Sequence, residues 1–199
     1  MLKPRALRRF GRDKKGLAAV EFALILPVMI TLFFGIVELS MALAARADVT
    51  NMASIAADLV AQESSMTSQD MANVFAASSA ILYPYSTAPA TITVYSIVDN
   101  GAAAGKVAWS CTKTGNGTAT TGPTSPPAGT TGGDMIAATN LDKNGNPQYG
   151  GPGSVILATI SYNYASPTTK IITGNIAMSN IFYSKPRRVA QITQPSAGF

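Results

Sequence analysis

An acidic residue at the start of a long apolar run is the feature of this sequence that points most directly to chemistry. Glu21 stands five residues after Gly16, and the sixteen residues that follow it, 22–37, carry no charge. A carboxylate at the centre of a membrane-spanning helix costs about 2.5–3.5 kcal/mol on insertion scales, so such residues usually serve a function. The alternative is a purely structural Glu21 that reaches back to the membrane surface beside the basic arm. We take Glu21 as the first candidate functional residue.

Other arrangements of reactive residues do not form a complete site. Histidine is absent, which removes the usual general base and the commonest metal ligand. Asp142, Asn144 and Asn146 have the first spacings of a calcium loop. The sixth position is Pro147 and the twelfth is Gly153, whereas that loop needs glycine and glutamate there. We therefore expect no enzyme activity, no catalytic, cofactor or metal site, and no small-molecule substrate.

The single cysteine, Cys111, cannot form a disulfide within the chain. In an exported protein an unpaired thiol can link two chains. A small apolar residue inside a strand is the commoner role of a lone cysteine, and we expect that role here.

The charge of the chain is concentrated at its N-terminus. The net charge is +5, but residues 1–16 alone carry +6 and the remaining residues carry −1. A nucleic-acid-binding protein places its basic residues on a folded face, so we expect no nucleic-acid partner. A basic arm directly before an apolar run instead indicates a cytoplasmic N-terminus and an exported C-terminal part.

The apolar run is long enough to cross a membrane. Residues 17–45 would form a helix of about 44 Å, which exceeds a hydrocarbon core of about 30 Å. Pro27 does not exclude a membrane helix, because neighbouring groups can satisfy the carbonyl that it frees. Apolar residues at three-and-four spacing then predict an amphipathic extension over residues 46–64. Glu38 lies about 26 Å from Glu21 along this helix, which predicts an interfacial position with a partner-helix contact as the alternative.

Residues 65–199 are expected to form an exported α+β head. A short helix is predicted over residues 68–82, with Ser68 as its N-cap. Residues 112–133 lack large apolar side chains and are expected to form a flexible loop, and the tail from Pro186 is expected to be loose. Period-two alternation and β-branched residues predict strands of a small antiparallel sheet at residues 91–98, 106–111, 153–164, 170–173 and 176–183.

In two of these strands the apolar residues are predicted to lie on one face. Ile92, Val94 and Val98 alternate with polar neighbours, which predicts a half-buried strand. In the next strand, Val107, Trp109 and Cys111 fall on one side. The fold class is therefore α+β, with a long N-terminal transmembrane helix, a short second helix and a sheet.

The N-terminal pattern resembles a known family. The order of a basic leader, Gly16, a small apolar run, Glu21-Phe22-Ala23-Leu24 and Leu26-Pro27 is similar to the TadE-like segment of tight-adherence (Flp, type IVc) pilus assembly proteins. The resemblance is specific over residues 15–52. It implies a minor pilin or pseudopilin-like protein, cleaved between Gly16 and Leu17 by a prepilin peptidase.

The resemblance also implies partners and roles. Gly16, Leu17, Glu21 and Phe22 would form the processing region, and Glu21, Pro27 and Glu38 would contact helices of neighbouring subunits. After cleavage, the Glu21 carboxylate would pair with the Leu17 ammonium of the next subunit. The expected partners are the bacterial inner membrane, other pilin subunits, the peptidase and the inner-membrane assembly platform.

Two alternatives remain open. One is an uncleaved single-pass membrane scaffold of the pilus secretion machinery. The other is a secreted adhesion or binding domain, released by signal peptidase near Ala44 or Ala47, where small residues alternate. The apolar run is longer than the usual 7–15 residues of a signal peptide, and Glu38 lies inside it, which argues against the second alternative.

Overall fold

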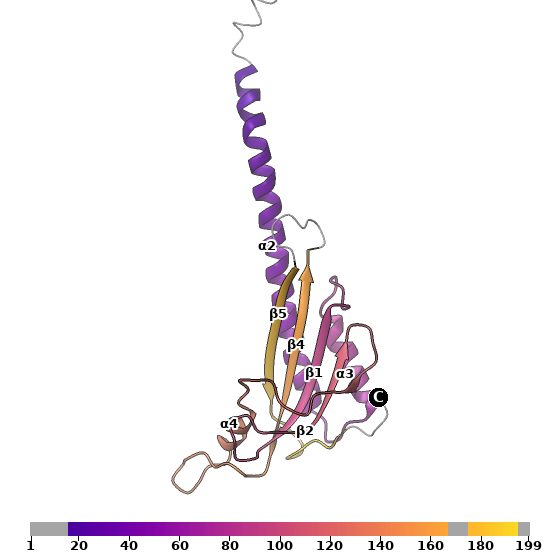
Figure 1. The fold of residues 1–199 in the computed structure, drawn as a ribbon, viewed down its shortest axis with the longest axis vertical. Helices are drawn as coiled ribbons and strands as arrows, with labels where there is room; N and C mark the ends of the chain where they lie inside the picture. Colours follow the sequence, from indigo (N-terminus) through magenta and orange to yellow (C-terminus); the bar gives the residue numbers. More distant parts are fainter. Residues whose placement is uncertain (1–15, 167–174, 195–199) are drawn as a thin grey trace, which may run out of the picture.

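The computed structural model describes residues 16–166 and 175–194. A long helix, α2 (Leu17–Ala61), is followed by a shorter helix, α3 (Ser68–Ala80), and then by a sheet with one small additional helix (Figure 1). The sheet and the small helix consist of β1 (Ala90–Val98), β2 (Lys106–Thr114), β3 (Thr120–Thr121), α4 (Gly132–Ala137), β4 (Ser154–Ala165) and β5 (Asn175–Ser184). The α+β class and the long N-terminal helix are confirmed.

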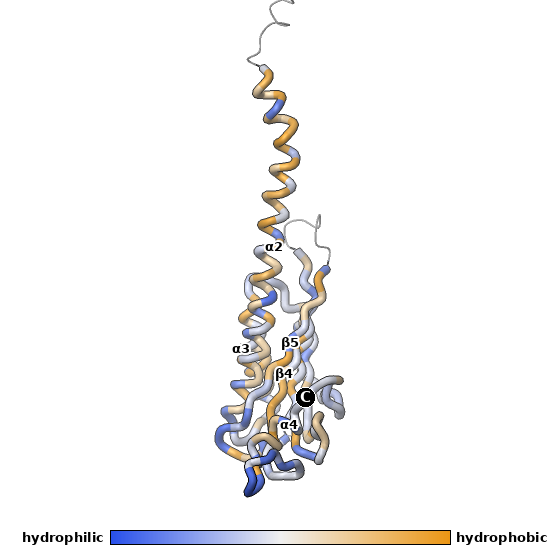
Figure 2. The backbone as a smooth tube through the Cα atoms, turned by 90° about the vertical axis from the view of Figure 1, so that its left-hand side faces the viewer, coloured by the Kyte–Doolittle hydropathy of each residue, from blue (hydrophilic) through white to orange (hydrophobic). Residues whose placement is uncertain are grey.

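Helix α2 continues through Pro27 without a break and ends at Ala61, three residues before the expected end of the extension at residue 64. Its first half extends away from the rest of the chain, and its second half packs on the sheet (Figures 1 and 2). The residues that this second half places in the main core include Ala45, Ala53 and Ala56, each completely buried. Small side chains let the helix approach the strands closely, so α2 is both a projecting rod and part of the core.

The five strands form one antiparallel sheet in the order β3-β2-β1-β4-β5. Alternate residues of β4 face α2, among them Ile156, Ile160 and Tyr164, all buried. Figure 2 shows α2 and α3 on one side of the molecule and the strands on the other. The main hydrophobic core therefore lies between these two helices and the sheet.

A second, smaller core covers the opposite face of the sheet at the end distant from the N-terminus. Tyr95 and Ile97 of β1 pack there against Ile136 of α4. For this reason β1 is buried on both faces, and the predicted half-buried strand is wrong in this respect. The register between β1 and β2 shifts at Ser96/Ile97, so that Val107 joins this second core while Trp109 joins the main one. The prediction that both point to one side is also wrong, because a bulge separates them.

Helix α3 begins at Ser68, as predicted, but ends at Ala80 and has a different N-cap residue. Thr67, not Ser68, is the N-cap: its hydroxyl accepts a hydrogen bond of 3.1 Å from the Asp70 N–H. The Asp70 carboxylate in turn accepts one of 3.0 Å from the Thr67 N–H. This reciprocal capping box satisfies two N–H groups at once, which favours threonine at that position.

Two segments that the sequence predicts to be loose contain regular secondary structure or packed residues. Residues 112–133 contain the end of β2, the short strand β3 and the start of α4. The tail from Pro186 is packed as far as Thr193: Ile192 is buried, and its carbonyl accepts a hydrogen bond of 2.9 Å from Trp109 Nε1. The predicted strand at 170–173 lies outside the described residues.

Candidate assembly site on the N-terminal helix

The first part of α2 makes no buried contact with the rest of the described chain. From Gly16 to Val37 every residue is exposed or partly exposed. The helix has the length and the composition of a membrane span, and its most apolar stretch is not buried at all. Among the described residues nothing covers this apolar surface, so this half of α2 is not a core helix of the described head.

Glu21 lies in this exposed part, as the sequence predicted, together with Phe22. No ion pair of Glu21 occurs among the described residues. The hydroxyl groups in the same region are satisfied within the helix: Thr31 Oγ1 donates to the Pro27 carbonyl at 2.8 Å and Ser40 Oγ to the Ile36 carbonyl at 2.8 Å. The carboxylate of Glu21 is thus the one charge on the exposed apolar part of α2.

The Gly16–Leu17 peptide bond lies at the very start of α2. Gly16 is the N-cap residue and no side chain caps the helix there. A Cβ atom placed on Gly16 would meet no atom of the described chain within 4 Å. There is therefore open space beside the Gly16 Cα on the described side.

Glu38 has the opposite environment from Glu21. It is completely buried, at the point where α2 first meets the head. It lies close to Tyr164 of β4: burial, the neighbouring Tyr85 and the Glu38 carboxylate together raise the pKa of the Tyr164 phenol. The structure thus puts Glu38 in contacts within the chain, a surrounding that its sequence position near the end of an apolar run did not indicate.

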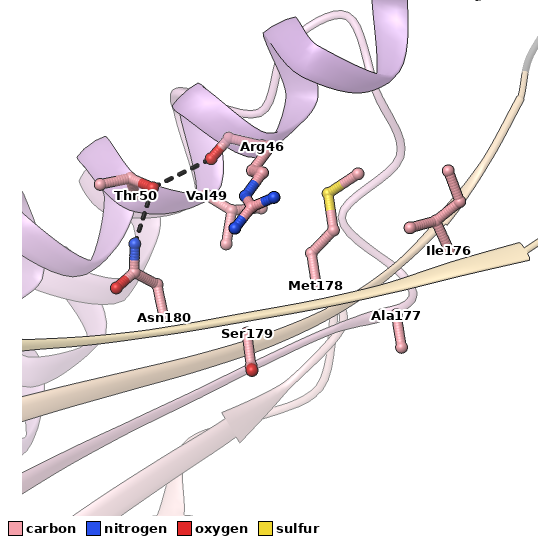
Figure 3. Close-up of a pocket in the computed structure, with 8 residues that line it drawn as sticks. All are labelled: Arg46, Val49, Thr50, Ile176, Ala177, Met178, Ser179 and Asn180. Atoms are coloured by element: carbon pink, nitrogen blue, oxygen red, sulfur yellow. Dashed lines mark hydrogen bonds between the residues drawn. The ribbon is translucent and has the colours of Figure 1, made fainter. Parts of the chain in front are cut away.

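A groove separates α2 from the edge strand β5 just beyond this point. It encloses about 400 Å³, and the Arg46 side chain points from α2 into it (Figure 3). Thr50 Oγ1 donates to the Arg46 carbonyl at 3.1 Å and accepts from Asn180 Nδ2 at 2.7 Å (Figure 3). The bond from Asn180 connects β5 to the helix, whereas the bond to the Arg46 carbonyl lies within α2 and orients the Thr50 hydroxyl.

The described residues contain no cluster of three or more His, Cys, Asp or Glu side chains that could hold a metal ion. Asp142 instead caps a turn, because its Oδ1 accepts N–H hydrogen bonds from Asn144 and Asn146 at 2.7 and 2.8 Å. These backbone donors lower the pKa of the Asp142 carboxyl, with the bond from Asn146 as the largest cause. The Asp142 carboxylate therefore accepts hydrogen bonds within its own turn.

Comparison with known proteins gives one match. The family model described as TadE-like protein matches residues 16–58, which begin at Gly16 and end within α2. No curated protein and no solved structure matches the chain. The matched segment includes the exposed half of α2 and most of the half that packs on the head. Residues 16–58 of this chain are thus a TadE-like segment, and the resemblance stated from the sequence is confirmed there.

Proposed function

We propose that this chain is a minor pilin-like component in the assembly of a tight-adherence (type IVc) pilus. The observation that carries the proposal is the coincidence of the TadE-like match with an exposed apolar helix that holds one acidic residue, Glu21, five residues after Gly16. Proteins of this kind act by assembly, so a role in the fibre or at its base is proposed in place of enzymatic turnover.

We infer that the protein crosses the inner membrane once. The leader, residues 1–16, would remain in the cytoplasm, and the charge difference between it and the rest of the chain supports this direction. Residues 17–45 would carry the span, 46–64 the helical extension, and 65–199 the exported head. The packing supports a hydrocarbon-spanning part that is shorter than residues 17–45, because α2 enters the core of the head at Glu38.

The proposed mechanism begins with cleavage after Gly16 by a prepilin peptidase. The cut would create an ammonium group on Leu17, four residues before Glu21. When N-terminal helices of neighbouring subunits pack together, the Glu21 carboxylate of one would pair with the Leu17 ammonium of the next. The pair offsets the desolvation of each charge, and a subunit out of register leaves both charges unpaired.

Glu38 takes a different role in this proposal. Because it is buried against the head, we assign it to holding α2 and β4 together. Contacts between neighbouring helices would then fall on Glu21, Pro27 and the exposed apolar side chains around them.

Release by signal peptidase near Ala44 is the less favoured alternative. Ala44 lies within the continuous helix α2, next to Ala42 and Ala45, which are buried against the head. A cut there would divide a packed helix and remove Glu38 from the core. An uncleaved membrane scaffold fits the same geometry as the pilin, and the two are separated by processing alone.

The test is the intact mass of the full chain, extracted from membranes of cells with and without the prepilin peptidase. We expect peptidase-dependent loss of residues 1–16, and no loss in a Gly16→Ala variant. Glu21→Ala should still be cleaved but should not enter pili, whereas Glu63→Ala, which removes an exposed acid just after α2, should behave as the parent. A mass that keeps Met1 would identify the scaffold, and a cut near Ala44 would identify a secreted domain.

A further inference from the structure

The free length of α2 fixes where the head lies relative to a bilayer. Residues 17–37 precede the first buried residue, Glu38. At about 1.5 Å per residue these 21 residues measure about 32 Å, close to the 30 Å of a hydrocarbon core. The head therefore begins where the hydrocarbon ends, and its near end falls in the interfacial layer of the leaflet on that side, about 5–8 Å thick.

The connection between α3 and β1 meets α2 at this level. Tyr85 Oη donates to the Met41 carbonyl at 3.1 Å. Met41 is four residues beyond Val37, so this contact lies about 6 Å past the end of the hydrocarbon core. In the same connection, Tyr83 is 86% exposed, more than any other large hydrophobic side chain of the described residues. Tyr85 thus contacts the helix at the depth of the lipid headgroups, and Tyr83 stands two residues before it in the same connection.

An apolar cavity of about 400 Å³ is lined in part by Tyr85. Its lining residues come from α2, from the connection and from β4. They carry no charge and include Met41, Pro84, Tyr85, Pro89, Tyr162 and Ala165. The polar end of Tyr162 is already satisfied, because its Oη donates to the Ser86 carbonyl at 3.2 Å. The cavity therefore suits methylene groups better than ions.

We propose that the Tyr83–Tyr85 turn and this cavity form a lipid-contacting surface, which seats the head on the bilayer and receives the upper acyl-chain segment of a phospholipid. Tyrosine suits this layer because its ring is apolar and its hydroxyl is a polar group that water can hydrate. The surface continues the membrane contact of α2 directly. The inference rests on the proposed membrane insertion of α2 and adds a second, lateral contact that fixes the tilt of the head.

The experiment uses the full chain, reconstituted into phosphatidylcholine vesicles with or without bromine atoms near the glycerol end of the acyl chains. Trp109 is buried in the head and supplies a constant background in the parent chain. A second tryptophan is introduced as Tyr83→Trp, as Phe33→Trp in the span, or as Tyr149→Trp at the distant end of the head. Brominated lipid is expected to remove most of the emission added by Tyr83→Trp and by Phe33→Trp, and none of that added by Tyr149→Trp.

The three reporters separate the possible failures. Quenching of Phe33→Trp without quenching of Tyr83→Trp would overturn the lipid-contacting surface and leave the membrane span intact. The same result is expected if another protein segment, such as a second copy of the chain, occupies the cavity. Absence of quenching for Phe33→Trp would overturn the membrane placement itself, and with it the proposal that depends on it.

Discussion

Cys111 lies on the side of β2 that faces the helices, and its thiol is fully enclosed by the main core. Burial is the main cause that raises the pKa of this thiol from 9.0 to about 11. Since the thiolate is the reactive species, a buried thiol with a raised pKa reacts slowly with disulfide reagents. The structure thus favours the apolar strand role over a link between chains.

The expected result follows directly. At about pH 8 the native chain in detergent should not react with Ellman's reagent, and the unfolded chain should release one equivalent of the coloured thiolate. A Cys111→Ser variant should give no signal in either state. A fast reaction of the native chain, or a reducible dimer in non-reducing electrophoresis, would contradict the burial of Cys111.

The two acids of α2 illustrate what sequence reasoning reaches at the scale of a residue. Glu21 is recognisable because its surroundings are local: a glycine, a small apolar run and an uncharged stretch. Glu38 gives the same local signal, a charge beside apolar residues, but its surroundings are made by Tyr164, which is far away in the chain. Burial caused by tertiary packing does not leave a pattern in the neighbouring residues, so the position of Glu38 required the structure.

At the scale of an element, α2 changes function along its length without changing its secondary structure. Its second half packs through small residues, and Ala56 is completely buried while Ala47 is exposed. Close packing of a helix on a sheet leaves no room for a larger side chain. Ala56→Leu should therefore lower the free energy of unfolding by about 1–3 kcal/mol.

Ala47→Leu provides the matched control, because alanine and leucine have similar helix propensities and position 47 faces away from the core. Thermal unfolding of the full chain in detergent, followed by the near-ultraviolet signal of Trp109, measures both. Equal melting temperatures for the two variants would mean that Ala56 is not closely packed in the core.

The sequence revealed those elements whose residue pattern extends over many positions. Helix α2 and strands β4 and β5 were found with nearly correct bounds, because apolar, β-branched or aromatic residues mark each of them over many positions. Helix α4 is six residues long, and the shift that turns Val107 away from Trp109 involves one residue. The packed tail depends on a carbonyl contact with Trp109. Features of this size produce no period to detect.

The whole molecule combines a rod that requires an apolar environment with a head that carries its own core. Most of the exposed large hydrophobic side chains of the described residues lie before Val37, whereas both cores lie after it. The tail strengthens the head independently of the rod. Ile192 is enclosed by the main core, and Arg187 donates to Asp58 of α2 through an exposed ion pair. The boundary that separates the two parts is therefore inside α2, not at its end.

This division predicts that the head folds without the exposed half of the helix. A chain that starts at Val37 should be a monomer in detergent-free buffer, with the near-ultraviolet circular dichroism of Trp109 unchanged, because it keeps every buried residue of α2. A chain that starts at Thr50 would lose Ala42, Ala45 and Val49 from the core and should not give this signal. Loss of the signal in the longer chain as well would mean that the membrane-spanning part contributes to the fold of the head, and that anchor and head form one cooperative unit.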